Sequence, residues 1–288
     1  MKISMIGLGK MGSALARRLM LAKFDLIVYN RTASKMTPFV EAGIACANSL
    51  QEAVENRDIV ITSLLDDQAV LQTVDGFVNF LKPGAIHLGT STILPDTSKQ
   101  LLDMHHQKNS IYVVGNVLGV PKAADRGELT SVVAGEEKAV DQCQPIFSAY
   151  STKTLVVGDV PYQANVVKVC MNYMLISAIE TMGELYAFAE KSDLDANIIH
   201  AWFHSVYAHP AFKLYVDKIK DRDFDNVNFD LKGGNKDVTL FQKALSDVGI
   251  VPDIANVIKN KFTIAKVNGL AEKDWSAITE VTRLLANM

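Results

Sequence analysis

The first segment that could carry chemistry is a glycine-rich loop near the N-terminus. It follows an apolar run at residues 2–6 and reads Gly7-Leu8-Gly9-Lys10-Met11-Gly12. In this G-x-G-x-x-G pattern the first glycine allows a tight turn, the second lets the backbone approach a pyrophosphate, and the third allows close helix–strand packing. The positive end of the following helix would then stabilise the phosphates. The loop therefore predicts a dinucleotide site; the alternative is a glycine-rich turn without a ligand.

The residues that end the second predicted strand bear on which nicotinamide dinucleotide would bind. A carboxylate at this place accepts hydrogen bonds from the ribose 2′-hydroxyl, whereas a 2′-phosphate needs a cation. The chain has no acid here; the residues are Asn30, Arg31 and Thr32. Because a guanidinium can pair with, or stack over, a phosphorylated adenosine ribose, we expect NADP(H) to be preferred over NAD(H). The alternative is that Arg31 is only a solvated turn residue.

A lysine and an asparagine, Lys168 and Asn172, stand four positions apart in a long helical pattern. Residues with this spacing lie on the same side of a helix, so both side chains can point into one cleft. An ammonium group within hydrogen-bonding reach can protonate the alkoxide that hydride transfer to a carbonyl leaves. On its own, such a pair is far more often a solvated helix face.

The elements that must position these residues alternate between short apolar runs and helical patterns up to about residue 158. This alternation is typical of βαβ units and a parallel sheet, and consecutive apolar residues indicate strands covered on both faces. Strands are expected at residues 2–6, 25–29, 58–62, 85–88, 111–114, 131–134 and 154–157. We therefore predict an α/β Rossmann-type fold with a doubly wound parallel sheet, an NADP-binding domain over residues 1–160.

The rest of the chain contains only helical patterns. Pro161 suits the first turn of a helix that continues to Lys191, and its apolar residues point in nearly every direction. Further helices are expected at residues 194–206, 212–220, 236–247, 253–268 and 275–287, with turns at Gly233-Gly234 and His209-Pro210. We predict that residues 161–288 form an all-α domain, joined by the long interdomain helix, for oligomerisation and substrate closure. The second domain alone is too small to bury the apolar residues on all sides of the long helix. We therefore expect a homodimer or homotetramer, in which another subunit covers the rest.

Composition and charge exclude several classes of protein. The chain has 288 residues, 49% of them hydrophobic, which is typical of a folded globular protein of about two domains. Its net charge of −3 offers no general attraction for nucleic acid, and no apolar stretch predicts a membrane span or a signal peptide. Cys46, Cys143 and Cys170 match neither disulfide nor zinc spacing. We expect reduced thiols in a cytoplasmic protein that acts on a small molecule.

Together the motifs resemble the β-hydroxyacid dehydrogenase family, which includes 3-hydroxyisobutyrate dehydrogenase, glyoxylate/succinic semialdehyde reductases and, more distantly, 6-phosphogluconate dehydrogenase. The similarity spans the whole chain. Besides the glycine loop and the pair of Lys168 and Asn172, it rests on the segments Ser63-Leu64-Leu65-Asp66-Asp67, Ser91-Thr92, Pro95-Asp96-Thr97-Ser98 and Lys236-Asp237.

The resemblance implies an NADP(H)-dependent oxidoreductase that interconverts a β-hydroxyacid or small alcohol with its aldehyde, semialdehyde or ketone. In the family the lysine, here Lys168, donates the proton, and the asparagine, here Asn172, orients the substrate. The residues implied to line the nicotinamide riboside are Leu64, Leu65 and Thr92. Lys236 is implied to reach the cofactor; the alternative is that Lys236-Asp237 only marks a helix start, where Asp237 would be favourable.

The chain departs from the family's substrate loop, which usually reads D-A-P-V-S-G-G-x-x-G-A-x-x-G-x-L. In the aligned residues 114–129, Leu118 replaces the serine and Val120 replaces a glycine. Neither side chain can donate a hydrogen bond to a substrate carboxylate, so the pocket should be more apolar. The candidate substrate-binding residues are Asn116, Leu118, Gly119, Lys168 and Asn172.

Two interpretations of the substrate stay open. It is either a less polar aldehyde, ketone or imine, or an acid whose carboxylate is held by Asn116, Lys122 or Lys168. Imine reductase-like activity on an apolar imine is one alternative function, although imine reductases usually carry another residue in place of the lysine. A catalytically weak NADP-binding regulatory protein is the other, and the presence of Lys168 and Asn172 argues against it.

Two histidines, His200 and His204, also stand four positions apart in a helical pattern. They could share a metal ion, but the sequence offers no third ligand at metal spacing beside them. We therefore predict no metal site.

Overall fold

The computed structural model describes residues 1–288 and divides into two compact units, residues 1–168 and 169–288. The division lies inside the long helix α8 (Tyr162–Lys191), not at residue 160, where the sequence pattern changes. The first turns of α8 belong to the first unit because they pack against the sheet, with Ala164 and Asn165 buried. Lys168 is therefore part of the same compact unit as the strands.

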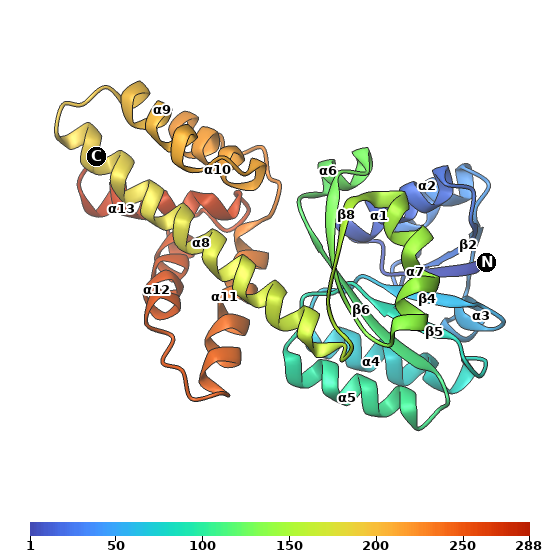
Figure 1. Ribbon diagram of the computed structural model, residues 1–288. Coiled ribbons are helices and arrows are strands. Elements are labelled where there is room, and N and C mark those ends of the chain that lie inside the picture. The colour runs from blue at the N-terminus through green and yellow to red at the C-terminus, as the bar shows by residue number, and fades with distance from the viewer. The chain divides into compact units, whose positions relative to one another are not determined.

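The first unit is built on one eight-stranded sheet in the order β3-β2-β1-β4-β5-β6-β7-β8 (Figure 1). Its strands are β1 (Lys2–Ile6), β2 (Asp25–Tyr29), β3 (Ala45–Cys46), β4 (Ile59–Thr62), β5 (Ile86–Gly89), β6 (Ile111–Leu118), β7 (Leu129–Ala134) and β8 (Ser151–Gly158). The chain builds outward from β1 to β3 and then returns to add β4 on the other side of β1. This reversal is the switch point at which doubly wound sheets bind ligands, and it confirms the predicted fold class.

One pair of strands differs from the predicted parallel sheet. β7 runs antiparallel to β6, with Val114 opposite Ala134. The connection between them holds only the short helix α6 (Pro121–Arg126), and parallel neighbours need a longer crossover. The strand β3 was not predicted because it is only two residues long and contains neither a β-branched nor an aromatic residue.

Helices cover both faces of the sheet, as the continuous apolar strands indicate. They are α1 (Lys10–Leu21), α2 (Thr37–Glu41), α3 (Leu50–Val54), α4 (Asp67–Phe77), α5 (Pro95–His106), α6 and α7 (Glu137–Tyr150), with the 3-10 helices η1 (Ala33–Lys35) and η2 (Val78–Phe80). α1, α6 and α7 contact one another on one face, and α4 contacts α3 and α5 on the other. The central strands β4 and β5 are buried at every residue.

The second unit is all helical, as predicted. After α8 it contains α9 (Ala196–Val206), α10 (Pro210–Asp221), α11 (Leu231–Ser246), α12 (Asp253–Val267), η3 (Trp275–Ile278) and α13 (Thr279–Leu285). The expected turn at Gly233-Gly234 is wrong, because both glycines lie inside α11. A Cβ on Gly234 would lie 2.9 Å from atoms of Phe262 and Trp275, so the glycine lets α11 pack closely. None of the chain's helices is both long and apolar enough to cross a membrane.

Candidate active site

The glycine-rich loop joins β1 to α1 with the geometry that its three glycines predict. Gly7 has a φ of +95°, and a Cβ on Gly12 would lie 2.0 Å from the carbonyl oxygen of Gly7. A Cβ on Gly9 would meet no atom within 4 Å. Gly9 also precedes the first turn of α1, which no side chain caps. The loop thus leaves space beside the positive end of a helix, and this arrangement fits the pyrophosphate of a dinucleotide.

Asn30, at the end of β2, holds this loop in place. Its Oδ1 accepts a hydrogen bond from the backbone N–H of Leu8 at 2.9 Å, and its Nδ2 donates to the carbonyl oxygen of Thr32 at 3.0 Å. Arg31 and Thr32 are exposed beside it. The amide of Asn30 therefore connects the phosphate loop to the segment where the sequence places the adenosine ribose.

The loops that follow β4 and β5 are joined by hydrogen bonds. The backbone N–H of Leu64 donates to Ser91 Oγ at 2.8 Å. Asp67 Oδ1 accepts from the N–H of Leu94 at 2.8 Å and from Thr97 Oγ1 at 2.6 Å. The predicted riboside contacts Leu64, Leu65 and Thr92 lie in these two loops. Because β1, β4 and β5 are parallel neighbours, the loops share the sheet edge that carries the glycine loop.

The start of α8 brings Lys168 to the end of β6. Lys168 Nζ donates a hydrogen bond to the carbonyl oxygen of Val117 at 2.9 Å. One turn earlier, Asn165 Nδ2 donates to Asn116 Oδ1 at 3.4 Å, and Asn116 Nδ2 donates to the carbonyl oxygen of Ser91 at 3.0 Å. A polar network thus connects the helix that carries the lysine with β6 and with the loop after β5.

Two asparagines in this network have distinct places. Asn116 is fully buried and both ends of its amide make hydrogen bonds, so it acts here as a positioning residue, and its contact with substrate stays a prediction. Asn165 is 1% exposed, yet its Oδ1 has no hydrogen-bond partner. Such atoms are uncommon in folded proteins because losing water without a replacement costs free energy. Sequence reasoning missed Asn165; the available signal is its spacing of three residues from Lys168, which places both on one side of the helix.

The divergent substrate loop begins where β6 ends. Gly119 has a φ of +131°, and a Cβ there would lie 2.6 Å from Leu129 Cδ2, so glycine is needed for the turn into α6. Leu118 and Val120 flank it and are half-buried. The loop therefore offers aliphatic side chains next to the carbonyl group that holds Lys168.

In the second unit, Asn172 is held by an acidic residue of α11. Asn172 Nδ2 donates to Asp237 Oδ2 at 3.1 Å, and Lys236 Nζ lies 2.8 Å from Asp237 Oδ1. The carboxylate is buried, with 3% of its side chain exposed. Because α11 begins at Leu231, Asp237 lies in its second turn, and the interpretation of Asp237 as a helix-start charge is wrong. Sequence reasoning named Asp237 but missed its contacts with Asn172 and Lys236.

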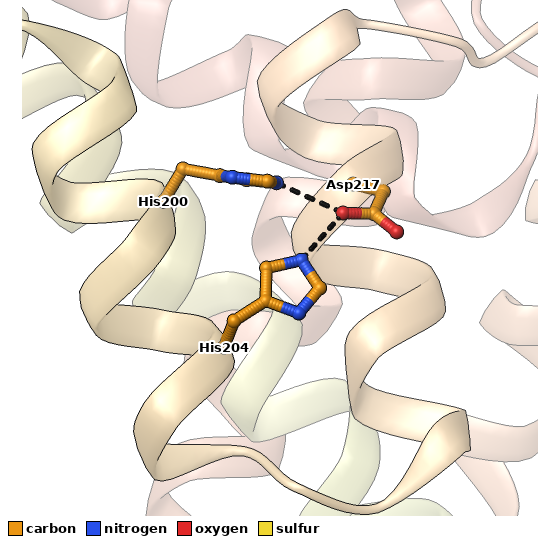
Figure 2. Close-up of side chains that lie close together, drawn as sticks. All are labelled: His200, His204 and Asp217. Atoms are coloured by element: carbon orange, nitrogen blue, oxygen red, sulfur yellow. Dashed lines mark hydrogen bonds and ion pairs between the residues drawn. The ribbon is translucent and has the colours of Figure 1, made fainter.

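The histidine pair acquires the third ligand that the sequence did not reveal. His200 and His204 of α9 both direct Nε2 to Asp217 Oδ1 of α10, at 2.8 and 2.7 Å (Figure 2). Asp217 is thus a possible third ligand that the sequence spacing did not reveal, and the absence of a metal ion stays a prediction. Asp217 is thirteen residues from His204 along the chain, on the next helix.

A Rossmann-type sheet with an open glycine loop at its switch point is the arrangement of a dinucleotide-binding protein. Residues 2–158 match the family model for the NAD binding domain of 6-phosphogluconate dehydrogenase, and residues 163–282 match the model for the NAD-binding region of NADP-dependent 3-hydroxyisobutyrate dehydrogenase. The chain belongs to the β-hydroxyacid dehydrogenase family, whose members are oxidoreductases that act on CH–OH groups.

Individual relatives cover nearly the full chain. An uncharacterized oxidoreductase of Bacillus subtilis, YfjR, is 31% identical over 281 residues, which cover 96% of this chain and 98% of the relative. Glyoxylate/succinic semialdehyde reductase 1 of Arabidopsis thaliana is 26% identical, with 98% and 99% covered. The structure of 3-hydroxyisobutyrate dehydrogenase from Mycobacterium tuberculosis with L-serine has a TM-score of 0.87 at 21% identity, with 98% and 99% covered.

Proposed function

We propose that the chain is an NADP(H)-dependent enzyme that interconverts a β-hydroxyacid or small alcohol with its aldehyde, semialdehyde or ketone. The observation that carries this proposal is the position of Lys168. Its ammonium group donates a hydrogen bond to the Val117 carbonyl, near the end of strand β6 in the doubly wound sheet. The names of two relatives, a glyoxylate/succinic semialdehyde reductase and a 3-hydroxyisobutyrate dehydrogenase, support the class of substrate.

In this proposal the chain supplies position and a proton. When bound, the nicotinamide supplies or accepts the hydride. Lys168 protonates the alkoxide oxygen in the reducing direction and takes the proton back in the oxidising direction. The Val117 carbonyl keeps the ammonium at the mouth of the substrate loop, while Asn172, held by Asp237, orients the substrate.

The cofactor is held by residues of three loops. Gly9 and Gly12 place the start of α1 against the pyrophosphate, Asn30 fixes the turn, and Leu64, Leu65 and Thr92 contact the riboside. We also assign Lys236 to the cofactor site, as the family resemblance implies. We infer a preference for NADP(H) because exposed Arg31 follows β2 where no carboxylate is present.

Leu118 and Val120 shape the proposed substrate preference. Aliphatic side chains at the loop make the site favourable for a substrate with an apolar part, because burying each CH₂ group contributes about 0.8 kcal/mol. Short unbranched acids such as glyoxylate are then expected to be poorer substrates than longer semialdehydes.

The first experiment tests the lysine. Oxidation of NADPH is followed with glyoxylate, short semialdehydes, apolar aldehydes and cyclic imines, using the wild type, Lys168→Ala and, as a control, exposed Lys153→Ala. Lys168→Ala should lower turnover by about 10²-fold or more, because a general acid contributes about that much. Normal turnover by Lys168→Ala refutes the role, reduction of imines alone favours an imine reductase, and tight NADPH binding without any turnover favours a regulatory protein.

A second experiment tests cofactor choice. Arg31→Ala should raise the KM for NADPH far more than the KM for NADH, because only the former carries the 2′-phosphate. Lys138→Ala, an exposed lysine on α7, is the control and should change neither constant. Equal effects of Arg31→Ala on the two cofactors contradict the proposed preference.

We also propose that the chain self-associates, as a dimer or tetramer, through its helical unit. Ile198, Trp202 and Val206 form a stripe along α9 and are 58%, 51% and 54% exposed, and Phe188 on α8 is 69% exposed. Burial of this stripe against a second copy would remove large apolar groups from water. Light scattering at micromolar concentration should show at least a dimer, and a stable monomer contradicts this.

The proposed location is the cytoplasm. Cys46, Cys143 and Cys170 are all free thiols, as a reducing compartment allows. Cell fractionation with an antibody to the chain should recover it with cytoplasmic markers.

A further inference from the structure

Three potential metal ligands converge between α9 and α10. His200 and His204 are four residues apart, so α9 presents both imidazoles on one side. Asp217 extends toward them from α10, which packs against α9 (Figure 2). Both Nε2 atoms face the same carboxylate oxygen, and one ligand atom from each of the three residues lies within 4.8 Å of the others.

The orientation of the imidazoles favours coordination of one ion. Their ring planes are tilted by 70°, with ring centroids 4.5 Å apart, so the rings do not stack face to face. Without an ion, each Nε2–H donates a hydrogen bond to Asp217 Oδ1 from a different side. An ion that replaced these two protons would receive the two Nε2 lone pairs from the same two directions, beside the carboxylate. A surface carboxylate can obtain its hydrogen bonds from water. Here two histidine side chains converge on one oxygen of Asp217, and this convergence is what a shared ion requires.

The spacing is compatible with a small divalent cation after a modest adjustment. Zn–N and Zn–O bonds of about 2.0–2.2 Å at tetrahedral angles place neighbouring ligand atoms about 3.3–3.5 Å apart. The Nε2 to Oδ1 distances of 2.8 and 2.7 Å are shorter, so each side chain would move outward by about half an ångström. The side chains of His200, His204 and Asp217 are 23%, 30% and 52% exposed, which leaves room for this movement and for an ion to enter.

The donor set selects the class of metal. Two imidazole nitrogens and one carboxylate oxygen suit Zn²⁺ and its neighbours in the first transition row, whereas Mg²⁺ and Ca²⁺ prefer sites of oxygen alone. Three protein ligands leave a fourth position of the tetrahedron for water or another small ligand.

We propose that His200, His204 and Asp217 form a Zn²⁺ site that links α9 to α10. The ion would connect the two helices across the loop of residues 207–209 and would stabilise the folded helical unit, because it binds the native arrangement of ligands and not the unfolded chain. The proposal does not depend on the chemistry assigned to Lys168.

Zinc binding to the full-length, tag-free chain tests the proposal. The metal is titrated in competition with a chromophoric chelator, and thermal unfolding is measured with and without added Zn²⁺. The variants are His204→Gln and Asp217→Asn, each of which removes one ligand. The matched control is His209→Gln, which replaces the exposed histidine at the N-cap of α10 and leaves His200, His204 and Asp217 in place.

The wild type and His209→Gln should each bind one Zn²⁺ per chain and should show a raised Tm with zinc. His204→Gln and Asp217→Asn should bind about 100-fold more weakly, because each ligand carries a large share of the affinity of such sites. The proposal is overturned if the wild type binds no zinc at micromolar concentration, or if either ligand variant binds as tightly as the control. If one ligand variant fails to fold, the other variant still locates the site, and a wild type that binds no zinc overturns the proposal by itself.

Discussion

Two buried histidines of the first unit, His87 and His105, are linked by a hydrogen bond. We expect them to make the folding stability of this unit depend on pH. Thr62 Oγ1 lies 2.9 Å from His87 Nε2, His87 Nδ1 lies 2.8 Å from His105 Nε2, and His105 Nδ1 lies 2.8 Å from Ser110 Oγ. Ser110 Oγ donates to the carbonyl oxygen of His105, so it accepts from Nδ1. Each neutral imidazole then uses one nitrogen as donor and the other as acceptor, and an added proton would disrupt this order.

Both histidines resist protonation in the folded state. Burial lowers the pKa of His105 from its ordinary value of 6.5 to about 4, with a smaller contribution from His106. Burial, and then the neighbouring His105, hold the pKa of His87 well below its ordinary range. Because the folded pKa is the lower one, the unfolded chain takes up protons first, and stability is lost as the pH falls below 6.5 toward 4.

The magnitude for His105 follows from these two values. Between pH 7.5 and pH 5.0 the unfolded imidazole gains nearly a full proton while the folded one gains little, which lowers the free energy of unfolding by about 2 kcal/mol. Urea unfolding of the wild type and of His105→Asn at the two pH values measures this contribution. The wild type should lose about 2 kcal/mol more than the variant. Far-UV circular dichroism is the suitable probe because Trp202 and Trp275 both lie in the second unit.

The control is His106→Asn, which replaces the exposed neighbour on α5 and should keep most of the wild-type loss, because His106 makes only the smaller contribution to the pKa of His105. The reasoning is refuted if His105→Asn loses as much stability as the wild type between pH 7.5 and 5.0. Because Thr62 ends β4 directly before the loop that holds Leu64, acid should also weaken NADPH binding over the same interval.

Two further predictions concern the proposed cofactor and substrate residues. Gly9→Ala should keep the unfolding free energy but weaken NADPH binding, because its Cβ enters the space left for the pyrophosphate. Gly12→Ala should also destabilise the chain, by roughly 1–3 kcal/mol, because its Cβ would overlap the Gly7 carbonyl oxygen. Urea unfolding and a fluorescence titration with NADPH separate the two, and equal stability of both variants contradicts the assignment. Asp237→Ala should lower kcat by about 10- to 100-fold because Asn172 loses its orientation, and Asp237→Asn, which keeps an acceptor, should lose less. Steady-state assays decide this, and wild-type kcat in both variants refutes a positioning role.

The pattern of apolar residues was sufficient to predict the helices and strands that local sequence alone determines. The pattern from Pro161 to Lys191 predicts α8 to within one residue, because apolar residues without breakers determine a helix locally. The run at residues 58–62 predicts β4 equally well, since a strand buried on both faces is apolar at each position. The glycine loop was predictable because each glycine is required by the backbone turn or by a close contact within the loop itself.

The predictions failed where distant parts of the chain decide the outcome. Gly233 and Gly234 read as a turn in isolation, and only the close approach of Phe262 and Trp275 explains them inside α11. Asn172 and Asp237 are 65 residues apart, and no local pattern reports that their side chains meet. Asp217 was missed for the same reason, since a ligand search along one helix does not include the next helix.

The contact of Lys168 with a backbone carbonyl separates the proposed chemistry from substrate specificity. If a side chain of the substrate loop held the ammonium, a substitution in that loop would move the proton donor as well. Because the Val117 carbonyl holds Lys168, and Asn116 and Asn165 tie β6 to α8, the side chains at positions 118 and 120 can change without changing that contact. Leu118 and Val120 can therefore alter which substrate fits while the lysine keeps its place. On this argument Leu118→Ser should shift preference toward substrates with a carboxylate and leave the effect of Lys168→Ala on turnover unchanged.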